Sequence, residues 1–309
     1  MDRRQFLLCF PTVALALKSG AIFAASAVKS PYTLRLWPGL PPGGGGPTGE
    51  MHISPKGAQS HIALPFLTVV TPVSPNGHGV LIAAGGGYKR IEMAMEAWPA
   101  AHWLVARGYT AYILSYRLPG EGWHDGNEVA LQDAQRALRM VRSREKQVSV
   151  LGFSAGGHLL AMAATRPDYR SYTRIDALDN LPPRADSAAL IYPIITLEKP
   201  FNHTSTHKIL LGHAATPAQE AAWSVQHYVT PQTPPVFLVQ AEDDPVSDPR
   251  NTLIMQAACI REQVDVTLYR YPTGGHGFAM GRLGTPTVQW PAHYEKWLSR
   301  LNRGQIVQA

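Results

Sequence analysis

Apolar runs of strand length alternate with amphipathic segments of helical period along most of the chain. Strands are predicted in residues 66–73, 78–85, 109–116, 147–153, 187–193, 235–242 and 265–272. Helices are predicted in residues 95–108, 128–144, 250–263 and 287–302, with another starting at about Gly156. The strands are rich in Val, Ile and Leu on both faces, which is typical of a mostly parallel sheet covered by helices on both sides. We therefore expect a single α/β domain over residues 28–309.

Two segments interrupt this alternation. Residues 37–50 (WPGLPPGGGGPTGE) are rich in Pro and Gly, and we expect a loose surface strap there. A phosphate-binding loop is not predicted here, because no predicted strand precedes the glycines and no predicted helix follows them. Between the strands 187–193 and 235–242, the sequence leaves room for short helices but for no large lid.

The first 27 residues have a character of their own. Residues 3–7 (RRQFL) resemble the twin-arginine export signal of bacteria, and residues 25–27 (ASA) resemble a cleavage site. The apolar stretch between them is interrupted by Lys18 and is too short for a membrane span. We interpret residues 1–27 as a removable export signal. The mature protein is then expected to be periplasmic or secreted, with no membrane attachment.

Charge and cysteine content exclude several classes of protein. The net charge is +6, of which +2 lies in the export segment, and the rest is spread without a block of like charges. Nucleic-acid binding is therefore not expected. Cys9 belongs to the export segment, so Cys259 would be the one cysteine of the mature chain, which excludes an internal disulfide. We expect Cys259 to be buried in a helix.

Ser154 lies in the sequence Gly152-Phe153-Ser154-Ala155-Gly156, between a predicted strand and a predicted helix. A serine here can be a simple helix N-cap, but G-x-S-x-G in this context is also the nucleophile-elbow pattern. A serine nucleophile needs a base and an orienting acid. The acidic pair 243–244 and His276 each follow a later predicted strand, so the order along the chain is Ser, Asp, His at strand ends. Parallel strands of such folds build their sites at these ends.

Seven segments in order give the chain a family resemblance: GGGY, SYRLP, DAQRALRMVRSR, GFSAGGHL, IYPI, PPVFLVQAEDDPV and GGHGF. From about residue 60 to 300 the chain resembles the α/β-hydrolase superfamily, and within it a carbohydrate-esterase-like group related to acetylxylan and feruloyl esterases. The resemblance implies the α/β-hydrolase fold and the catalytic residues Ser154, Asp244 and His276, with Asp243 as the near alternative for the acid. It also implies oxyanion donors from Gly86, Gly87 and Ala155.

This sequence departs from the pattern at two positions. Ala84 stands where many lipases have a histidine before the three glycines, and Ser247 stands where relatives often have valine. Residues beside the expected catalytic loops are candidates for an acyl or sugar pocket, although so many aromatic residues are also common in a core. These candidates are Tyr88, Glu96, Tyr116, Trp123, Phe153, Tyr192 and Phe278.

Other polar residues have weaker interpretations. Glu96 either lines the cleft or caps the helix before Trp98. Glu92 and Glu96 also have the i, i+4 spacing of a carboxylate pair on one helix. Glycoside hydrolysis would need a second carboxylate-bearing element facing them, and nothing in the sequence supports one. His158 is expected to be structural. His203 and His207 have the i, i+4 spacing of metal ligands on a helix, but no third ligand follows at a recognisable spacing, so we expect neither metal nor cofactor.

Together these features predict an exported serine carboxylesterase that hydrolyses short-chain, acetyl-like esters of small molecules or oligosaccharides. Two alternatives remain open at this point. The same triad serves lactone hydrolases and peptidases, and a binding protein can keep the fold without catalysis.

Overall fold

The computed structural model of the chain describes residues 30–306, so the predicted export signal lies outside the described residues. Eight strands form one sheet in the order β1-β4-β6-β5-β7-β8-β9-β10. Their bounds are β1 Tyr32–Arg35, β4 Phe66–Val70, β5 His78–Ala83, β6 Thr110–Ser115, β7 Gln147–Phe153, β8 Ser187–Ile191, β9 Val236–Ala241 and β10 Val266–Tyr271. Neighbours from β6 to β10 pair in parallel, whereas β4 is antiparallel to both β6 and β1. The predicted, mostly parallel sheet is confirmed.

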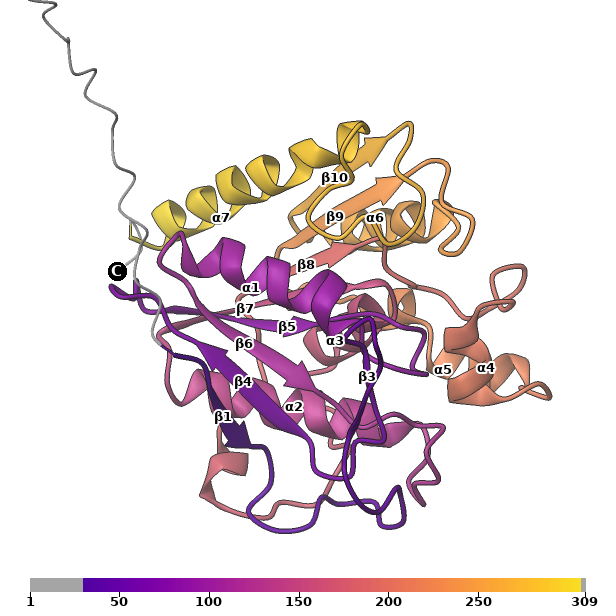
Figure 1. Cartoon of the computed structure of the whole chain (residues 1–309). Coiled ribbons are helices and arrows are strands. Elements are labelled where there is room, and N and C mark those ends of the chain that lie inside the picture. Colours follow the sequence, from indigo (N-terminus) through magenta and orange to yellow (C-terminus); the bar gives the residue numbers. More distant parts are fainter. Residues whose placement is uncertain (1–29, 307–309) are drawn as a thin grey trace, which may run out of the picture.

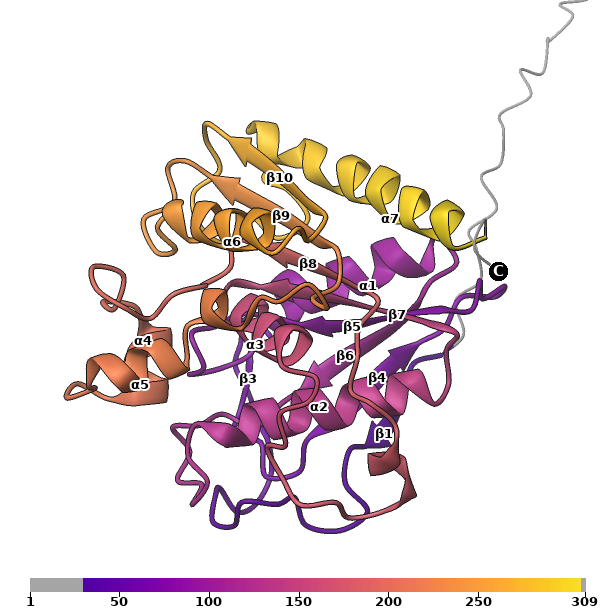
Figure 2. The ribbon, with the colours of Figure 1, turned by 180° about the vertical axis from the view of Figure 1, so that it is seen from behind.

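Helices cover both faces of this sheet (Figures 1 and 2). On one face lie α1 (Trp98–Val105) and α7 (Trp290–Ile306), joined by stacked rings of Trp103 and Tyr294, whose centroids are 5.8 Å apart. On the other face lie α2 (Glu128–Arg142), α3 (Ser154–Thr165) and α6 (Arg250–Arg261). The fully apolar strands are thus buried from both sides, as their composition predicts.

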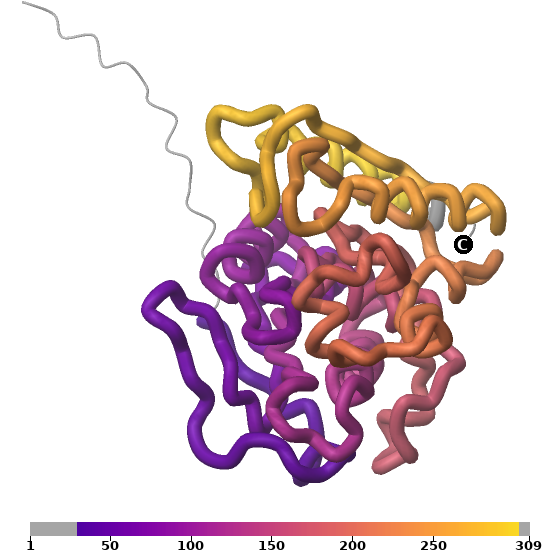
Figure 3. The backbone as a smooth tube through the Cα atoms, turned by 90° about the vertical axis from the view of Figure 1, so that its right-hand side faces the viewer, coloured from indigo at the N-terminus to yellow at the C-terminus, as the bar shows by residue number. Residues whose placement is uncertain are grey.

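The chain reverses its direction across the sheet beside β5. After β5 it passes through α1 to β6 on one side, and then returns through α2 to β7 on the other side of β5. In open parallel sheets a crevice forms at such a switch point, outside the carboxyl ends of the strands. Figure 3 looks onto this edge of the sheet.

The connection from β8 to β9 carries two short helices, α4 (Ser205–Leu211) and α5 (Pro217–Ala222), and a 3-10 turn η3 (Val225–Tyr228). They lie at the edge where the parallel strands end (Figure 1). This matches the expectation of short helices without a large lid. None of the helices in residues 30–306 has the length and apolar character needed to cross a bilayer.

Element boundaries differ modestly from the predictions. The helix expected over 95–108 begins as a π-helical turn, η1 (Met93–Ala97), before α1, and α3 starts at Ser154 itself instead of at Gly156. The edge strand β1 and the small pair β2 (His52–Ile53) and β3 (Gln59–Ser60) were not predicted, because their residues lack an apolar run. Cys259 is buried in α6, as predicted, and burial raises the pKa of its thiol to about 12.

The prediction of a loose strap over residues 37–50 is wrong. Trp37 is buried, and its indole N–H donates to Asp133 of α2 at 2.8 Å. Further along, the carbonyl of Gly44 accepts the backbone N–H of His124 at 2.9 Å, and the N–H of Gly46 donates to the carbonyl of Gly122 at 2.9 Å. Backbone hydrogen bonds and a buried aromatic anchor therefore fix this strap to the loop before α2.

Two of the family-like segments meet in a buried ion pair beneath the strap. Arg117, from SYRLP, places its guanidinium against Asp133, from DAQRALRMVRSR, with Nη2 2.8 Å from Oδ1 and Nε 3.0 Å from Oδ2. Both side chains are completely buried. A buried charge pair of this kind needs its hydrogen bonds satisfied. This ion pair therefore contributes to the stability of the fold.

Candidate active site

Ser154 occupies a strained turn between β7 and α3. Its φ is +50°, a region that residues other than glycine seldom adopt. The turn depends on the flanking glycines, since a Cβ on Gly152 would lie 2.6 Å from the Gly156 carbonyl oxygen, and one on Gly156 would lie 2.2 Å from that of Ala83. The sequence Gly152-Phe153-Ser154-Ala155-Gly156 thus forms the sharp strand-to-helix turn of a nucleophile elbow.

The structure brings the three predicted catalytic side chains together. Ser154 Oγ lies 2.9 Å from His276 Nε2, and His276 Nδ1 lies 2.8 Å from Asp244 Oδ2. Since the carboxylate accepts the hydrogen on Nδ1, Nε2 of the neutral ring is free to accept the serine hydroxyl hydrogen. The imidazole side chain is 19% exposed, whereas the side chain of Asp244 is 0% exposed and Ser154 is buried, so the histidine is the member of the three with the most contact with solvent.

A set of donors holds the carboxylate of Asp244. Its Oδ1 accepts the backbone N–H groups of Val246 at 2.8 Å and Ser247 at 2.9 Å, and its Oδ2 also accepts Gln240 Nε2 at 3.0 Å. Ser247, one of the two departures from the family pattern, donates its hydroxyl to the carbonyl of Pro193 at 2.7 Å and so ties the acid loop to the end of β8. Sequence reasoning missed Gln240, although a glutamine within an apolar strand was a usable signal.

Asp243 faces away from the imidazole. Its Oδ1 accepts the backbone N–H of Gly275 at 2.7 Å, and so holds the loop that carries His276. From the other side, Arg282 Nη2 donates to the His276 carbonyl at 3.0 Å. Sequence reasoning did not find Arg282, because nothing in the sequence around it marks a contact with the loop.

The glycine loop after β5 lies against Ser154. A Cβ on Gly85 would be 2.8 Å from the Cβ of Ser154, so any side chain there would collide with the serine. Gly86 and Gly87 follow with φ of +121° and +63°. Ala155 lies in the first turn of α3, where N–H groups have no acceptor within the helix. Ala155 directly follows the serine, and Gly86 and Gly87 directly follow Gly85; their role as oxyanion donors stays a prediction. Ala84, the other departure, accepts the Tyr116 hydroxyl at 2.8 Å.

The residues predicted to line an aromatic substrate pocket are packed inside the protein, and their contact with a substrate stays a prediction. The proposed lining residues are all buried, with exposed fractions of 0 to 4%: Tyr88, Glu96, Tyr116, Phe153, Tyr192 and Phe278. They form a packed layer under the site, in which Tyr192 lies edge-on to Phe278 with ring centroids 4.5 Å apart. Trp123 packs on the strap instead, because a Cβ on Gly46 would lie 2.5 Å from its ring.

His158 is structural, as expected. Its Nε2 lies 2.8 Å from the Trp223 carbonyl and its Nδ1 2.9 Å from the Tyr88 hydroxyl. Burial lowers its pKa to about 4, so the ring is neutral near pH 7. A carbonyl can only accept, so Nε2 carries the hydrogen and Nδ1 accepts from Tyr88. The ring thereby links the segment after the glycine loop to the end of α5.

His203 and His207 do not lie on one face of a helix, although their i, i+4 spacing would allow this. α4 begins at Ser205, so His203 lies in the preceding loop, where its Nδ1 is 3.2 Å from the Pro200 carbonyl. His207 is buried, and its Nε2 is 2.9 Å from Glu220 of α5. No group of three or more His, Cys, Asp or Glu side chains within residues 30–306 is arranged to hold a metal ion.

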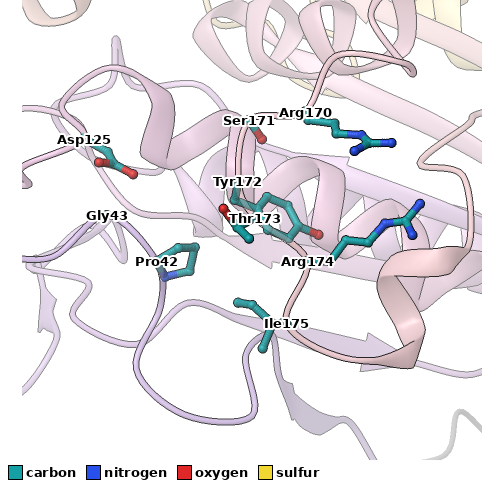
Figure 4. Close-up of a pocket in the computed structure, with 9 residues that line it drawn as sticks. All are labelled: Pro42, Gly43, Asp125, Arg170, Ser171, Tyr172, Thr173, Arg174 and Ile175. Carbon is teal, nitrogen blue, oxygen red and sulfur yellow. The ribbon is translucent and has the colours of Figure 1, made fainter.

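A hollow of about 930 Å³ opens between the strap, the loop before α2 and the segment after α3 (Figure 4). Its lining residues are Pro42, Gly43, Asp125, Arg170, Ser171, Tyr172, Thr173, Arg174 and Ile175. In Figure 4 the two arginine side chains extend away from Asp125. None of these residues belongs to the arrangement around Ser154, so the hollow is separate from the candidate active site.

The fold has known counterparts. An acetyl ester-xyloside bifunctional hydrolase from Caldicellulosiruptor lactoaceticus superposes with a TM-score of 0.73 and 28% identity, covering 88% of this chain and 96% of that one. A carboxylesterase from Lactobacillus plantarum superposes with a TM-score of 0.64 and 23% identity, covering 82% and 97% of the two chains. The predicted α/β-hydrolase fold is confirmed.

Sequence comparison gives the same group. An acetylxylan esterase from Xylanibacter ruminicola is 28% identical over 221 residues, which are 68% of this chain and 43% of that protein. The chain therefore spans less than half the length of this curated relative. The sequence profile of the BD-FAE family matches residues 75–258, more than half of the chain, and this range includes Ser154, Asp244 and the glycine loop after β5. The chain belongs to the BD-FAE family of α/β-hydrolases.

Proposed function

We propose that the protein is a serine carboxylesterase that hydrolyses short-chain, acetyl-like esters of carbohydrates through an acyl-enzyme. The observation that carries this proposal is the hydrogen-bonded series from Ser154 through His276 to Asp244. A serine hydroxyl becomes an effective nucleophile when a positioned imidazole accepts its proton. The relatives that are named as an acetylxylan esterase and an acetyl ester-xyloside hydrolase support acetylated carbohydrate as the substrate class.

Acylation begins when Ser154 Oγ forms a bond to the ester carbonyl carbon and its proton moves to His276 Nε2. The carbonyl π electrons move to the oxygen, which becomes an oxyanion. The backbone N–H groups of Gly86, Gly87 and Ala155 are the donors proposed for it. One such donor typically contributes about 10²–10³ in rate. Asp244 stabilises the imidazolium while it exists.

Collapse of this intermediate breaks the bond between the carbonyl carbon and the alcohol oxygen, which takes the proton from His276 Nε2. A water molecule then gives a proton to His276 and attacks the acyl carbon. Ser154 Oγ leaves and recovers that proton, so the acid is released and the enzyme is restored. These side chains and backbone amides carry every bond and proton change, so the proposal includes no cofactor.

The packing beneath the serine supports a small acyl group. The side chains of Phe153, Tyr192 and Phe278 are buried and their rings pack against one another, an arrangement that suits a short acyl group better than a long chain. On the opposite side, α4 closes against the glycine loop, since a Cβ on Gly87 would lie 2.0 Å from Ser205 Oγ. Acetyl esters are therefore favoured over long-chain esters.

The test is the Ser154→Ala variant, with Ser143→Ala at the end of α2 as a matched control. We expect the loss of p-nitrophenyl acetate hydrolysis to be on the order of 10⁴-fold or more, with unchanged thermal unfolding. Labelling of Ser154 by a fluorophosphonate probe separates an enzyme from a binding protein. A folded Ser154→Ala protein with near wild-type turnover would contradict the mechanism.

Release of acetate from acetylated xylo-oligosaccharides tests the substrate class. Cleavage of lactones or peptides in place of these esters would revise the proposed substrate class.

A further inference from the structure

Glu96 is a buried carboxylate beside the candidate active site with no part in the reaction steps above. It lies in η1 and is 4% exposed. Its Oε2 accepts the backbone N–H of Gly85 at 2.5 Å, and its Oε1 accepts the hydroxyl of Tyr192 at 2.9 Å. Gly85 opens the glycine loop that contains the proposed oxyanion donors, and Tyr192 follows directly after β8. One carboxylate thus joins two of the loops that build the site.

Tyr192 continues this connection to the histidine loop. Its ring lies edge-on to the imidazole of His276, with centroids 5.0 Å apart and planes at 62°. Its hydroxyl oxygen accepts the backbone N–H of Ala279 at 3.1 Å, three residues beyond the histidine. The backbone of Tyr192 has φ of +39°, a conformation that persists only where the surroundings impose it.

The two contacts on Glu96 suit its ionised form. Both partners donate, so each carboxylate oxygen must accept, and a proton on either oxygen would compete with one of them. Burial raises the pKa of Glu96 to about 7, while the hydrogen bonds from Gly85 and Tyr192 and the charge of His276 act in the opposite direction. The ionisable groups that face Glu96 are His276, Tyr192, Tyr116 and Glu92.

We propose that Glu96 is a positioning residue. It holds the glycine loop after β5 and the loop that carries His276 in the relative positions that catalysis requires. By anchoring the N–H of Gly85, it directs the following amides of Gly86 and Gly87. Through the hydroxyl of Tyr192 it fixes the ring against which His276 packs. This role replaces the expectation that Glu96 lines the cleft or caps a helix. It rests on the proposed esterase function.

The first test is Glu96→Gln, with Glu92→Gln as the matched control. Glutamine has the same shape but offers one acceptor oxygen where Glu96 offers two. We expect kcat for p-nitrophenyl acetate to fall about 10- to 100-fold with little change in KM, less than the loss of a whole donor. The control changes the same functional group four residues earlier, where Glu92 pairs with the exposed Arg90 at 2.5 Å. It should stay within about twofold of wild type.

The pH profile is the readout that a merely structural role would not move. In the wild type, protonation of either Glu96 or His276 should lower activity, so the acid limb of log kcat/KM approaches a slope of two. In Glu96→Gln one ionisation remains, and the slope approaches one. The Glu92→Gln control should keep the wild-type slope.

A second variant serves if Glu96→Gln does not fold. Tyr192→Phe keeps the ring against His276 and removes the hydroxyl that joins Glu96 to Ala279, so kcat should again fall with KM little changed. Folded variants with wild-type kcat and an unchanged acid limb would overturn the proposal. Fluorophosphonate labelling of the wild type distinguishes a failure of the role of Glu96 from a failure of the proposed esterase function. A labelled, active wild type with indistinguishable variants refutes the role of Glu96 alone, whereas an unlabelled and inactive wild type refutes the esterase function as well.

Discussion

Asp243 accepts the backbone N–H of Gly275 at 2.7 Å, although Gly275 is the neighbour of the histidine that Asp244 holds. Two adjacent carboxylates therefore fix the same loop by different atoms. Asp243 holds the backbone ahead of His276, whereas Asp244 holds the imidazole ring itself at 2.8 Å. During the proposed reaction the charge of the ring changes and the charge of the Gly275 amide does not. The two aspartates should therefore differ strongly in their effect on turnover.

Substitution by asparagine at each position measures this difference. Asp244→Asn removes the acceptor that fixes the imidazole tautomer, and we expect kcat to fall by up to ~10⁴ with little change in KM. Asp243→Asn keeps a side-chain oxygen that can accept the N–H of Gly275, so turnover should fall by less than about tenfold. Steady-state kinetics on the two purified variants compare them directly. A larger loss at Asp243 would transfer the role of the acid to that residue.

The buried ion pair beneath the strap should matter for stability and not for turnover. Asp133→Asn leaves the guanidinium of Arg117 completely buried beside a neutral group, and such a loss typically costs roughly 3–5 kcal/mol of unfolding free energy. Urea-induced unfolding measures this loss, with Asp168→Asn as a control at an exposed pair with Arg184. We expect little change in the control. A wild-type midpoint for Asp133→Asn, or a large drop in kcat of the folded protein, would contradict this assignment.

The parallel strands and the long helices were predictable because each of them has a local sequence signal, which the edge strand β1 lacks. The parallel strands are continuous apolar runs, and the elbow requires glycines at fixed positions around Ser154. The same holds for the order of Ser154, Asp244 and His276, which the strand ends bring to one edge. Their catalytic roles remain predictions. Between Asp243 and Asp244 the sequence offers no physical distinction, because the direction of a side chain on a tight turn depends on contacts far along the chain.

What the sequence did not reveal depends on long-range packing. Tyr88, Tyr116 and Tyr192 adjoin the catalytic loops in sequence, but adjacency does not indicate whether a ring faces the substrate or the core. Gln240 and Arg282 act through hydrogen bonds to the acid and to the histidine loop that no local sequence pattern indicates. The strap looks mobile by composition, yet Trp37 anchors it through Asp133, 96 residues away. Such contacts are properties of the assembled fold.

Residues 1–27 lead to a prediction about export. We propose that Arg3 and Arg4 belong to a twin-arginine signal that directs the folded protein out of the cytoplasm. Replacing both by lysine keeps the positive charge and removes the guanidinium pair, so precursor should accumulate in the cytoplasm. Cell fractionation followed by immunoblotting compares this variant with wild type. Cleaved protein outside the cytoplasm at the wild-type level would show that another route exports it.

The buried position of Glu96 also predicts how stability changes with pH. Burial raises its pKa from the ordinary value of 4.5 to about 7, so the folded protein binds this proton more tightly than the unfolded chain does. The resulting stabilisation is fully present below about pH 4.5 and is lost as the pH rises toward 7. The difference between the two pKa values corresponds to roughly 3 kcal/mol.

Glu96→Gln lacks this ionisation. Between pH 4.5 and 8, its unfolding free energy should therefore rise relative to that of the wild type by roughly 3 kcal/mol. Urea unfolding of both proteins across this range provides the measurement. His158 acts in the opposite sense, because its lowered pKa makes the fold less stable as the pH falls from 6.5 toward 4. That contribution is common to both proteins and cancels in their difference. Parallel stability curves would mean that the pKa of Glu96 in the folded protein is not raised above its value in the unfolded chain. A variant that gains stability at high pH while losing kcat would show that the carboxylate is kept for catalysis at a cost in stability.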